Sequence, residues 1–140
     1  MNSDRPIRSA KAELLDLVGE LHTPEEAGAI LFPHTADVLS KIDQLREESV
    51  ILSLEADGQH RYPAFQLDIA ERRVRNAVEY ANRVQHAAAR PWSTAAWWLT
   101  ASPLFADDRG RALTPMELAA TGVLTQIAVD NILVHGSARM

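Results

Sequence analysis

The sequence predicts a mainly α-helical protein, in which a helix-turn-helix with a small β-hairpin wing is followed by a compact helical domain. Apolar residues recur at helical spacing in several segments. Thr23-Pro24-Glu25-Glu26 and Thr114-Pro115-Met116-Glu117 both have the pattern of a capping box, in which a threonine hydroxyl and a glutamate carboxylate satisfy amides at a helix start. Asp57-Gly58 between two apolar runs is typical of a β-hairpin, because glycine tolerates the positive φ of such turns.

Three short helices are expected in the first half. Leucines and a valine on one helical face predict a helix over 10–21. The first capping box begins a second helix, which should end near Pro33 because proline cannot donate to the helical ladder. Apolar residues at helical spacing predict a third helix over 36–48. The tight break between the second and third helices indicates a helix-turn-helix.

A wing and a long helix should follow. Segments 50–55 and 60–67 flank the Asp57-Gly58 turn and predict two strands, and Pro63 places the second strand at a sheet edge. Residues 69–89 are expected to form one long amphipathic helix that ends before Pro91.

The last third should contain a tryptophan-rich block over 92–99, a loop over 102–113, the second capping box and a last helix after Gly122. The expected organisation is an N-terminal helix (1–22), a helix-turn-helix with hairpin (23–68), a connecting helix (69–90) and a helical domain (91–140).

Composition narrows the classes of function. The chain has no cysteine, which excludes disulfides and thiolate metal sites. Its first ten residues are polar, and no apolar run approaches the roughly 20 residues of a membrane span, so a soluble cytoplasmic protein is expected. The net charge of −5 gives no overall basic footprint for nucleic acid, so any contact with DNA must be local.

No pattern of an enzyme stands out. The histidines lack the i, i+4 spacing that places two imidazoles on one helix face; they are His22, His34, His60, His86 and His135. Segment 107–111 lacks the glycine spacing of a phosphate-binding loop and is expected to be a solvated loop. We therefore expect a binding protein rather than an enzyme, with no cofactor and no metal.

All the tryptophans lie within seven positions, at Trp92, Trp97 and Trp98. Adjacent helical residues point about 100° apart, so Trp97 and Trp98 cannot both face one core. Two interpretations stay open: one tryptophan marks a contact surface, or all three close a small core.

The third predicted helix is the natural recognition element of a helix-turn-helix, because its first residues would meet base edges. Candidate DNA-binding residues there and in the wing are Thr35, Ser40, Lys41, Gln44, Arg46 and Arg61. Asp37, Asp43, Glu47 and Glu48 share the helix and would repel phosphates unless they point away.

Two segments resemble a known family. Gly58-Gln-His-Arg-Tyr-Pro-Ala-Phe-Gln-Leu-Asp68, preceded by Leu45-Arg-Glu, resembles a motif of proteins related to the Xre/MbcA/ParS antitoxins. Trp98-Leu99, Pro103-Leu104-Phe105, Leu113-Thr-Pro-Met-Glu-Leu118 and Gly122, in this order, resemble the C-terminal toxin-binding domain of that family. Together the two segments cover roughly Thr23 to Leu133. The third helix is more acidic than the arginine-rich version usual in the family.

The resemblance implies a homodimeric antitoxin that neutralises a RES-type, NAD-consuming toxin by occluding its active site, with operator DNA as a second partner. The implied toxin-binding residues are Trp97, Trp98, Leu104, Phe105, Arg109 and Arg111. Two alternatives stay open: a stand-alone winged helix-turn-helix regulator, and a protein-only adaptor or dimerisation module.

Overall fold

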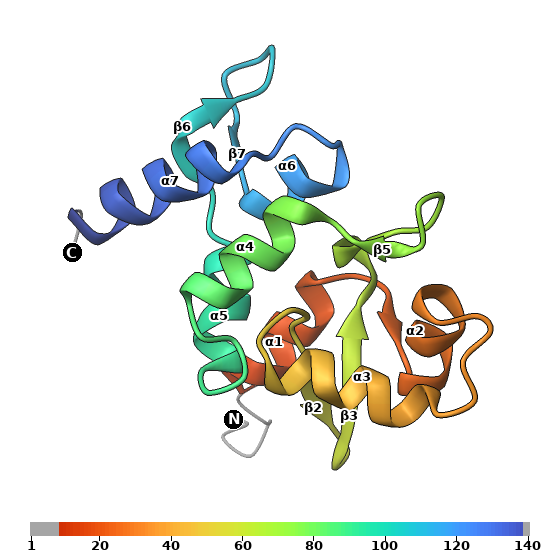
Figure 1. Ribbon diagram of the computed structural model, residues 1–140. Coiled ribbons are helices and arrows are strands. Elements are labelled where there is room, and N and C mark those ends of the chain that lie inside the picture. Colours follow the sequence, from red (N-terminus) through yellow and green to blue (C-terminus); the bar gives the residue numbers. More distant parts are fainter. Residues whose placement is uncertain (1–8, 139–140) are drawn as a thin grey trace, which may run out of the picture.

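The computed structural model describes residues 9–138, which form a mixed α/β protein with seven α-helices and three small antiparallel sheets (Figure 1). About 49% of it is helical and 17% is strand. The prediction of a mainly α protein with a compact helical second half is therefore wrong. Its strands are only two to five residues long, and an alternating pattern cannot be recognised in so few residues.

The first half combines three helices with a three-stranded sheet. Its elements are α1 (Ala10–Leu17), β1 (Leu21–His22), α2 (Pro24–Leu31), α3 (Val38–Glu47), β2 (Leu54–Ala56) and β3 (Gln59–Pro63). The strand order is β1-β3-β2, so β3 is central, and the prediction of an edge strand is wrong. Pro63 lies at the last position of β3, opposite Leu21, where it ends the ladder. The helix expected over 10–21 is shorter because Gly19, at φ +82°, turns the chain into β1.

The two helices around Pro33 and the hairpin around Asp57-Gly58 are present, but residues 32–37 separate α2 from α3, and the strands are shorter than the predicted 50–55 and 60–67. Thr23 Oγ1 accepts from the Glu26 amide at 3.1 Å, and Glu26 Oε1 accepts from the Thr23 amide at 2.9 Å, so the first capping box is confirmed. Asp57 and Gly58, at φ +57° and +77°, form the turn between β2 and β3. Helices α2 and α3 approach closely at Gly28, where an added Cβ would clash with Val38 Cγ2.

The long helix expected over 69–89 is not continuous. The chain first forms η1 (Ala64–Gln66) and a hairpin of β4 (Leu67–Asp68) and β5 (Arg73–Val74), and only then α4 (Asn76–Val84). Arg72, at φ +54°, has the left-handed conformation that a helix interior does not tolerate. The apolar spacing looked helical because Val74 of β5 and Val78 and Ala81 of α4 all enter the same core.

The last third consists of α5 (Pro91–Trp98), β6 (Ser102–Ala106), β7 (Ala112–Leu113), α6 (Pro115–Ala120) and α7 (Gln126–Ala138). The segment expected to be a loop is the β6–β7 hairpin. The second capping box is confirmed, since Thr114 Oγ1 accepts from the Glu117 amide at 3.0 Å and Glu117 Oε1 accepts from the Thr114 amide at 2.9 Å. In Figure 1 this hairpin, α6 and α7 lie at the top, and α4 and α5 lie between them and the first half.

A buried polar network joins the two halves. The side chains of Gln66, Asn82 and Trp98 are fully buried. Gln66 Oε1 accepts from the Leu52 amide at 2.7 Å and from Asn82 Nδ2 at 3.0 Å, and Asn82 Oδ1 accepts from Trp98 Nε1 at 3.0 Å. Because each of these buried atoms has a partner, the network fixes α5 on α4 and both on the first half. Within the described residues, no helix is both long and apolar enough to cross a membrane.

Candidate functional site

Trp98 lies in the core, whereas its neighbour Trp97 lies nearer the surface. Trp98 is fully buried and packs edge-on against Phe65 and Trp97, at centroid distances of 4.9 and 4.8 Å. Trp97 is half-buried, and its Nε1 is buried without a hydrogen-bond partner in the described part of the chain. As placed here, Trp98 supports the fold and does not reach a partner, whereas Trp97 lies closer to the surface.

Strand β6 carries the other two apolar residues that the sequence suggested. Leu104 is 43% exposed and Phe105 is half-buried against the core. Both lie in the hairpin that projects from the second half (Figure 1). Leu104 is therefore available for contact, while Phe105 anchors the hairpin.

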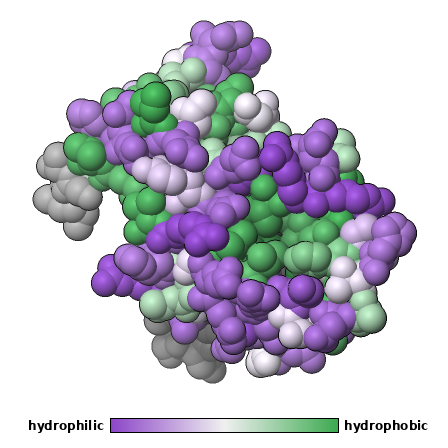
Figure 2. Space-filling view, in the orientation of Figure 1, coloured by the Kyte–Doolittle hydropathy of each residue, from purple (hydrophilic) through white to green (hydrophobic). Residues whose placement is uncertain are grey.

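Helix α7 carries further exposed apolar side chains, which the sequence did not suggest. Val123, just before the helix, and Ile127 and Val134 within it are 59%, 73% and 64% exposed. Ile127 and Val134 are seven residues apart and so lie on one side of the helix, opposite the buried Val129 and Ile132. Apolar side chains are visible along α7 in Figure 2. We call Leu104, Val123, Ile127 and Val134 the apolar face.

Beside the apolar face, the loop of the β6–β7 hairpin is held by Asp107. Its Oδ1 accepts from the amides of Arg109 and Arg111, both at 2.9 Å. Its backbone carbonyl accepts from the Gly110 amide at 3.0 Å. The bonds from the Arg111 and Arg109 amides to the carboxylate, more than the charge of Arg111, hold the pKa of the Asp107 carboxyl below its ordinary value.

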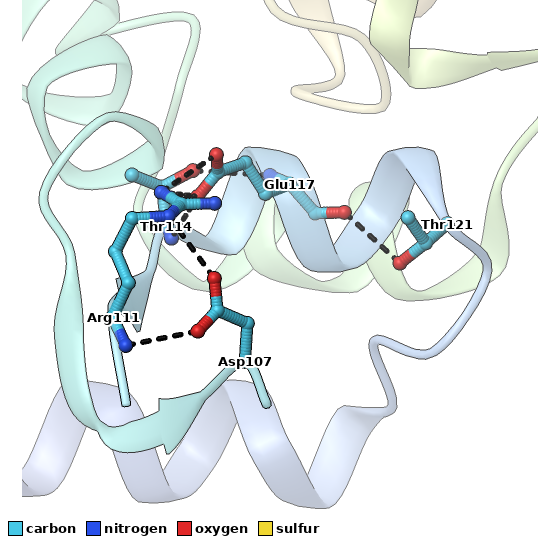
Figure 3. Close-up of polar contacts among 5 residues, drawn as sticks. All are labelled: Asp107, Arg111, Thr114, Glu117 and Thr121. Carbon is cyan, nitrogen blue, oxygen red and sulfur yellow. Dashed lines mark hydrogen bonds and ion pairs between the residues drawn. The ribbon is translucent and has the colours of Figure 1, made fainter. Parts of the chain in front are cut away.

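Arg111 ties this loop to α6, as Figure 3 shows. Its Nε donates to Asp107 Oδ2 at 3.2 Å, and its Nη1 donates to Glu117 Oε2 at 3.2 Å. The same Glu117 closes the capping box of α6, and the Thr114 amide is the largest cause of the lowered pKa of Glu117. Arg111 is thus already paired with two carboxylates. Arg109 is exposed at the tip, and its guanidinium has no hydrogen bond or ion pair within residues 9–138.

The residues considered for DNA binding are only partly brought together. Ser40, Lys41 and Gln44 are exposed on α3, and Thr35 is half-buried before it. The Arg46 guanidinium lies 3.4 Å from Asp43 and 3.8 Å from Glu47, and Gln44 donates to Glu48. Arg61, on the hairpin, donates to Gln59 Oε1 and to the His60 carbonyl. Acidic neighbours therefore neutralise Arg46, whereas the exposed Lys41 has no carboxylate partner among the described residues.

A polar cluster at the end of α3 was also not suggested by the sequence. Ser53 Oγ and His60 Nδ1 lie 2.7 Å apart beside a cavity of about 190 Å³, also lined by Arg46, Glu55 and Trp92. A serine hydroxyl bonded to an imidazole is part of the arrangement used in nucleophilic catalysis. The other ring nitrogen, however, has no carboxylate partner among the described residues, so the arrangement is incomplete. Within the same residues no three side chains form a metal-binding group.

Comparisons with known proteins assign no family to the chain. No protein-family model matches the chain, and no curated protein or solved structure matches it. On the exposures and contacts described above, the candidate functional site is the apolar face together with the hairpin loop.

Proposed function

We propose that this chain is an antitoxin that binds a RES-type, NAD-consuming toxin and inhibits it by covering the entrance to its active site. The observation that carries the proposal is the apolar face. Its four side chains belong to two neighbouring elements of the second half, β6 and the α7 region, which are in contact. Exposed large apolar side chains gathered along one side of a helix, as Ile127 and Val134 are, are typical of protein-interaction sites.

Sequence and surface point to the same part of the chain. The second of the two segments that resemble the Xre/MbcA/ParS antitoxins begins at Trp98 and includes Leu104 and Gly122. It thus spans β6, the hairpin loop and α6, and it leads directly into α7. The role proposed here is binding alone, with no reacting group contributed by this chain.

Co-expression with the toxin-like product of the neighbouring gene tests the proposal. The wild-type chain should relieve growth arrest and form a complex that suppresses NAD consumption by the purified toxin. The Ile127→Asp variant should weaken the complex by about tenfold or more, because a carboxylate would be buried in an apolar contact. Leu17→Asp is the matched control, since Leu17 is 61% exposed and lies on α1.

The two variants make the result decisive. Equal loss of binding in Ile127→Asp and Leu17→Asp would show that the apolar face is not the contact surface. Failure of the wild-type chain to bind or inhibit any RES-type toxin would overturn the antitoxin function itself.

Operator binding is left outside this proposal. Arg46 is paired with Asp43 and Glu47, and Arg61 on β3 already donates to the His60 carbonyl. Lys41 is therefore the cation of α3 without a carboxylate partner in the described part of the chain. A single exposed lysine gives weak support for a DNA-binding helix.

A further inference from the structure

We propose that the tip of the β6–β7 hairpin is a preorganised recognition element, in which Arg111 is a positioning residue and Arg109 contacts a carboxylate of the partner. This inference rests on the proposed function and assigns separate roles to two arginines of the same loop.

The tip of the hairpin is rigid. Residues 108–110 are closed by two backbone hydrogen bonds between Asp107 and its neighbours: the Asp107 amide donates to the Arg111 carbonyl at 2.9 Å, and Gly110 donates to the Asp107 carbonyl at 3.0 Å. The bonds from the Arg109 and Arg111 amides to Asp107 Oδ1 are added to these. Gly110 has φ +83°, which suits a residue without a Cβ. The tip is therefore held in one conformation before any partner arrives.

The two arginines of the loop differ in their partners. Arg111 lies between Asp107 and Glu117 and donates to both, so a further carboxylate would meet an already neutralised group. Arg109 is exposed, and within the described residues its side chain has neither an acidic partner nor a hydrogen bond. Its own amide is fixed by Asp107 at 2.9 Å. The structure thus presents a free guanidinium on a fixed backbone.

A fixed loop with a free guanidinium favours binding in two ways. Ordering a loop lowers affinity when it occurs on association, and a loop ordered beforehand avoids that loss. A guanidinium pairs with a carboxylate through two parallel hydrogen bonds, a geometry that depends on orientation.

The test uses the full chain and its purified cognate toxin. The variants are Arg109→Ala, Arg111→Ala and the double variant, with Arg90→Ala as a matched exposed-arginine control. Affinity is measured by calorimetry, and the order of the tip is measured by amide hydrogen exchange at Arg109 and Arg111. Arg109→Ala should weaken binding about tenfold and leave exchange unchanged. Arg111→Ala should weaken binding and also speed exchange at the tip.

The double variant separates positioning from contact. If Arg111 acts by placing Arg109, the double variant should lose less affinity than the two single losses combined. Faster exchange with unchanged affinity in Arg111→Ala would reduce Arg111 to a purely structural residue and overturn the inference. Additive losses with unchanged exchange would make Arg111 a direct contact, which also overturns it. If the wild-type chain binds the toxin and Arg109→Ala binds equally well, the inference fails while the proposed function stands.

Discussion

The indole nitrogen of Trp98 donates a hydrogen bond of 3.0 Å to Oδ1 of Asn82, and neither side chain is exposed to solvent. Asn82 in turn donates to the Val50 carbonyl at 3.2 Å and to Gln66 Oε1. Through these bonds α5, which directly precedes the β6–β7 hairpin, is fixed to the first half. The second half is thus supported by a network in which Gln66, Asn82 and Trp98 all have hydrogen-bond partners, whereas Trp97 Nε1 has none among the described residues.

The same substitution should have different effects at the two adjacent tryptophans. Trp98→Phe leaves Asn82 Oδ1 without a donor and should lower the free energy of unfolding by about 1–3 kcal/mol more than Trp97→Phe does. Trp97→Phe removes a buried nitrogen that has no partner in the described part of the chain, which offsets the loss of ring area. Urea denaturation of both variants measures the difference. Equal losses would mean that the Trp98–Asn82 bond does not contribute.

Gly28→Ala should destabilise the helix-turn-helix pair. Alanine gains about 1 kcal/mol in helix propensity over glycine. Its methyl group, however, would clash with the stiff side chain of Val38, and such overpacking costs typically about 1–3 kcal/mol. We therefore expect Gly28→Ala to lower thermal stability. The Gly28→Ala/Val38→Ala variant should be somewhat more stable than Val38→Ala alone, because the added methyl group no longer meets the Val38 side chain. A stability gain in Gly28→Ala would show that α2 and α3 can separate without cost.

The sequence was informative where structure depends on near neighbours. Both capping boxes and the Asp57-Gly58 turn were predicted because each needs only about four consecutive residues. Strand β1 was not predicted, since two residues show no alternation and Leu21 pairs with Pro63 far along the chain. Arg72 interrupts the expected long helix because its φ is positive, a conformation that an arginine in the sequence does not predict.

The site was predictable in part for similar reasons. Helix geometry indicated that Trp97 and Trp98 face different ways, but the choice between them depends on Asn82, 16 residues before Trp98. The apolar face of α7 was missed because the helix carries apolar residues on two sides, and only the fold shows that Ile132 is buried while Ile127 is exposed. Arg111 was grouped with Arg109 because its pairing with Glu117 requires the hairpin to be folded.

Acid should loosen the hairpin loop. The pKa values of Asp107 and Glu117 are lowered in the folded chain, so their contribution to stability is present above the ordinary carboxyl range and is lost as pH falls through the folded values. Amide exchange at Arg109 and Arg111, corrected for its intrinsic pH dependence, should therefore increase below about pH 4. In Asp107→Asn the acid-dependent change should be smaller, because position 107 no longer titrates. An identical pH profile in this variant would show that Asp107 does not control the loop.

Charge reversal on α3 should separate a structural arginine from a DNA-binding helix. Arg46 lies near Asp43 and Glu47 with its side chain 24% exposed, so Arg46→Glu places three carboxylates together and should cost about 1–2 kcal/mol of unfolding free energy. Lys41→Glu, at an exposed position, should change stability by less than about 0.5 kcal/mol. Denaturation curves test both values, and gel shifts with promoter DNA at low salt test recognition. If the wild-type chain binds DNA in a salt-dependent manner and Lys41→Glu abolishes this binding, the DNA-binding alternative is favoured. Salt dependence indicates contacts with phosphates, and Lys41 would then supply one of them.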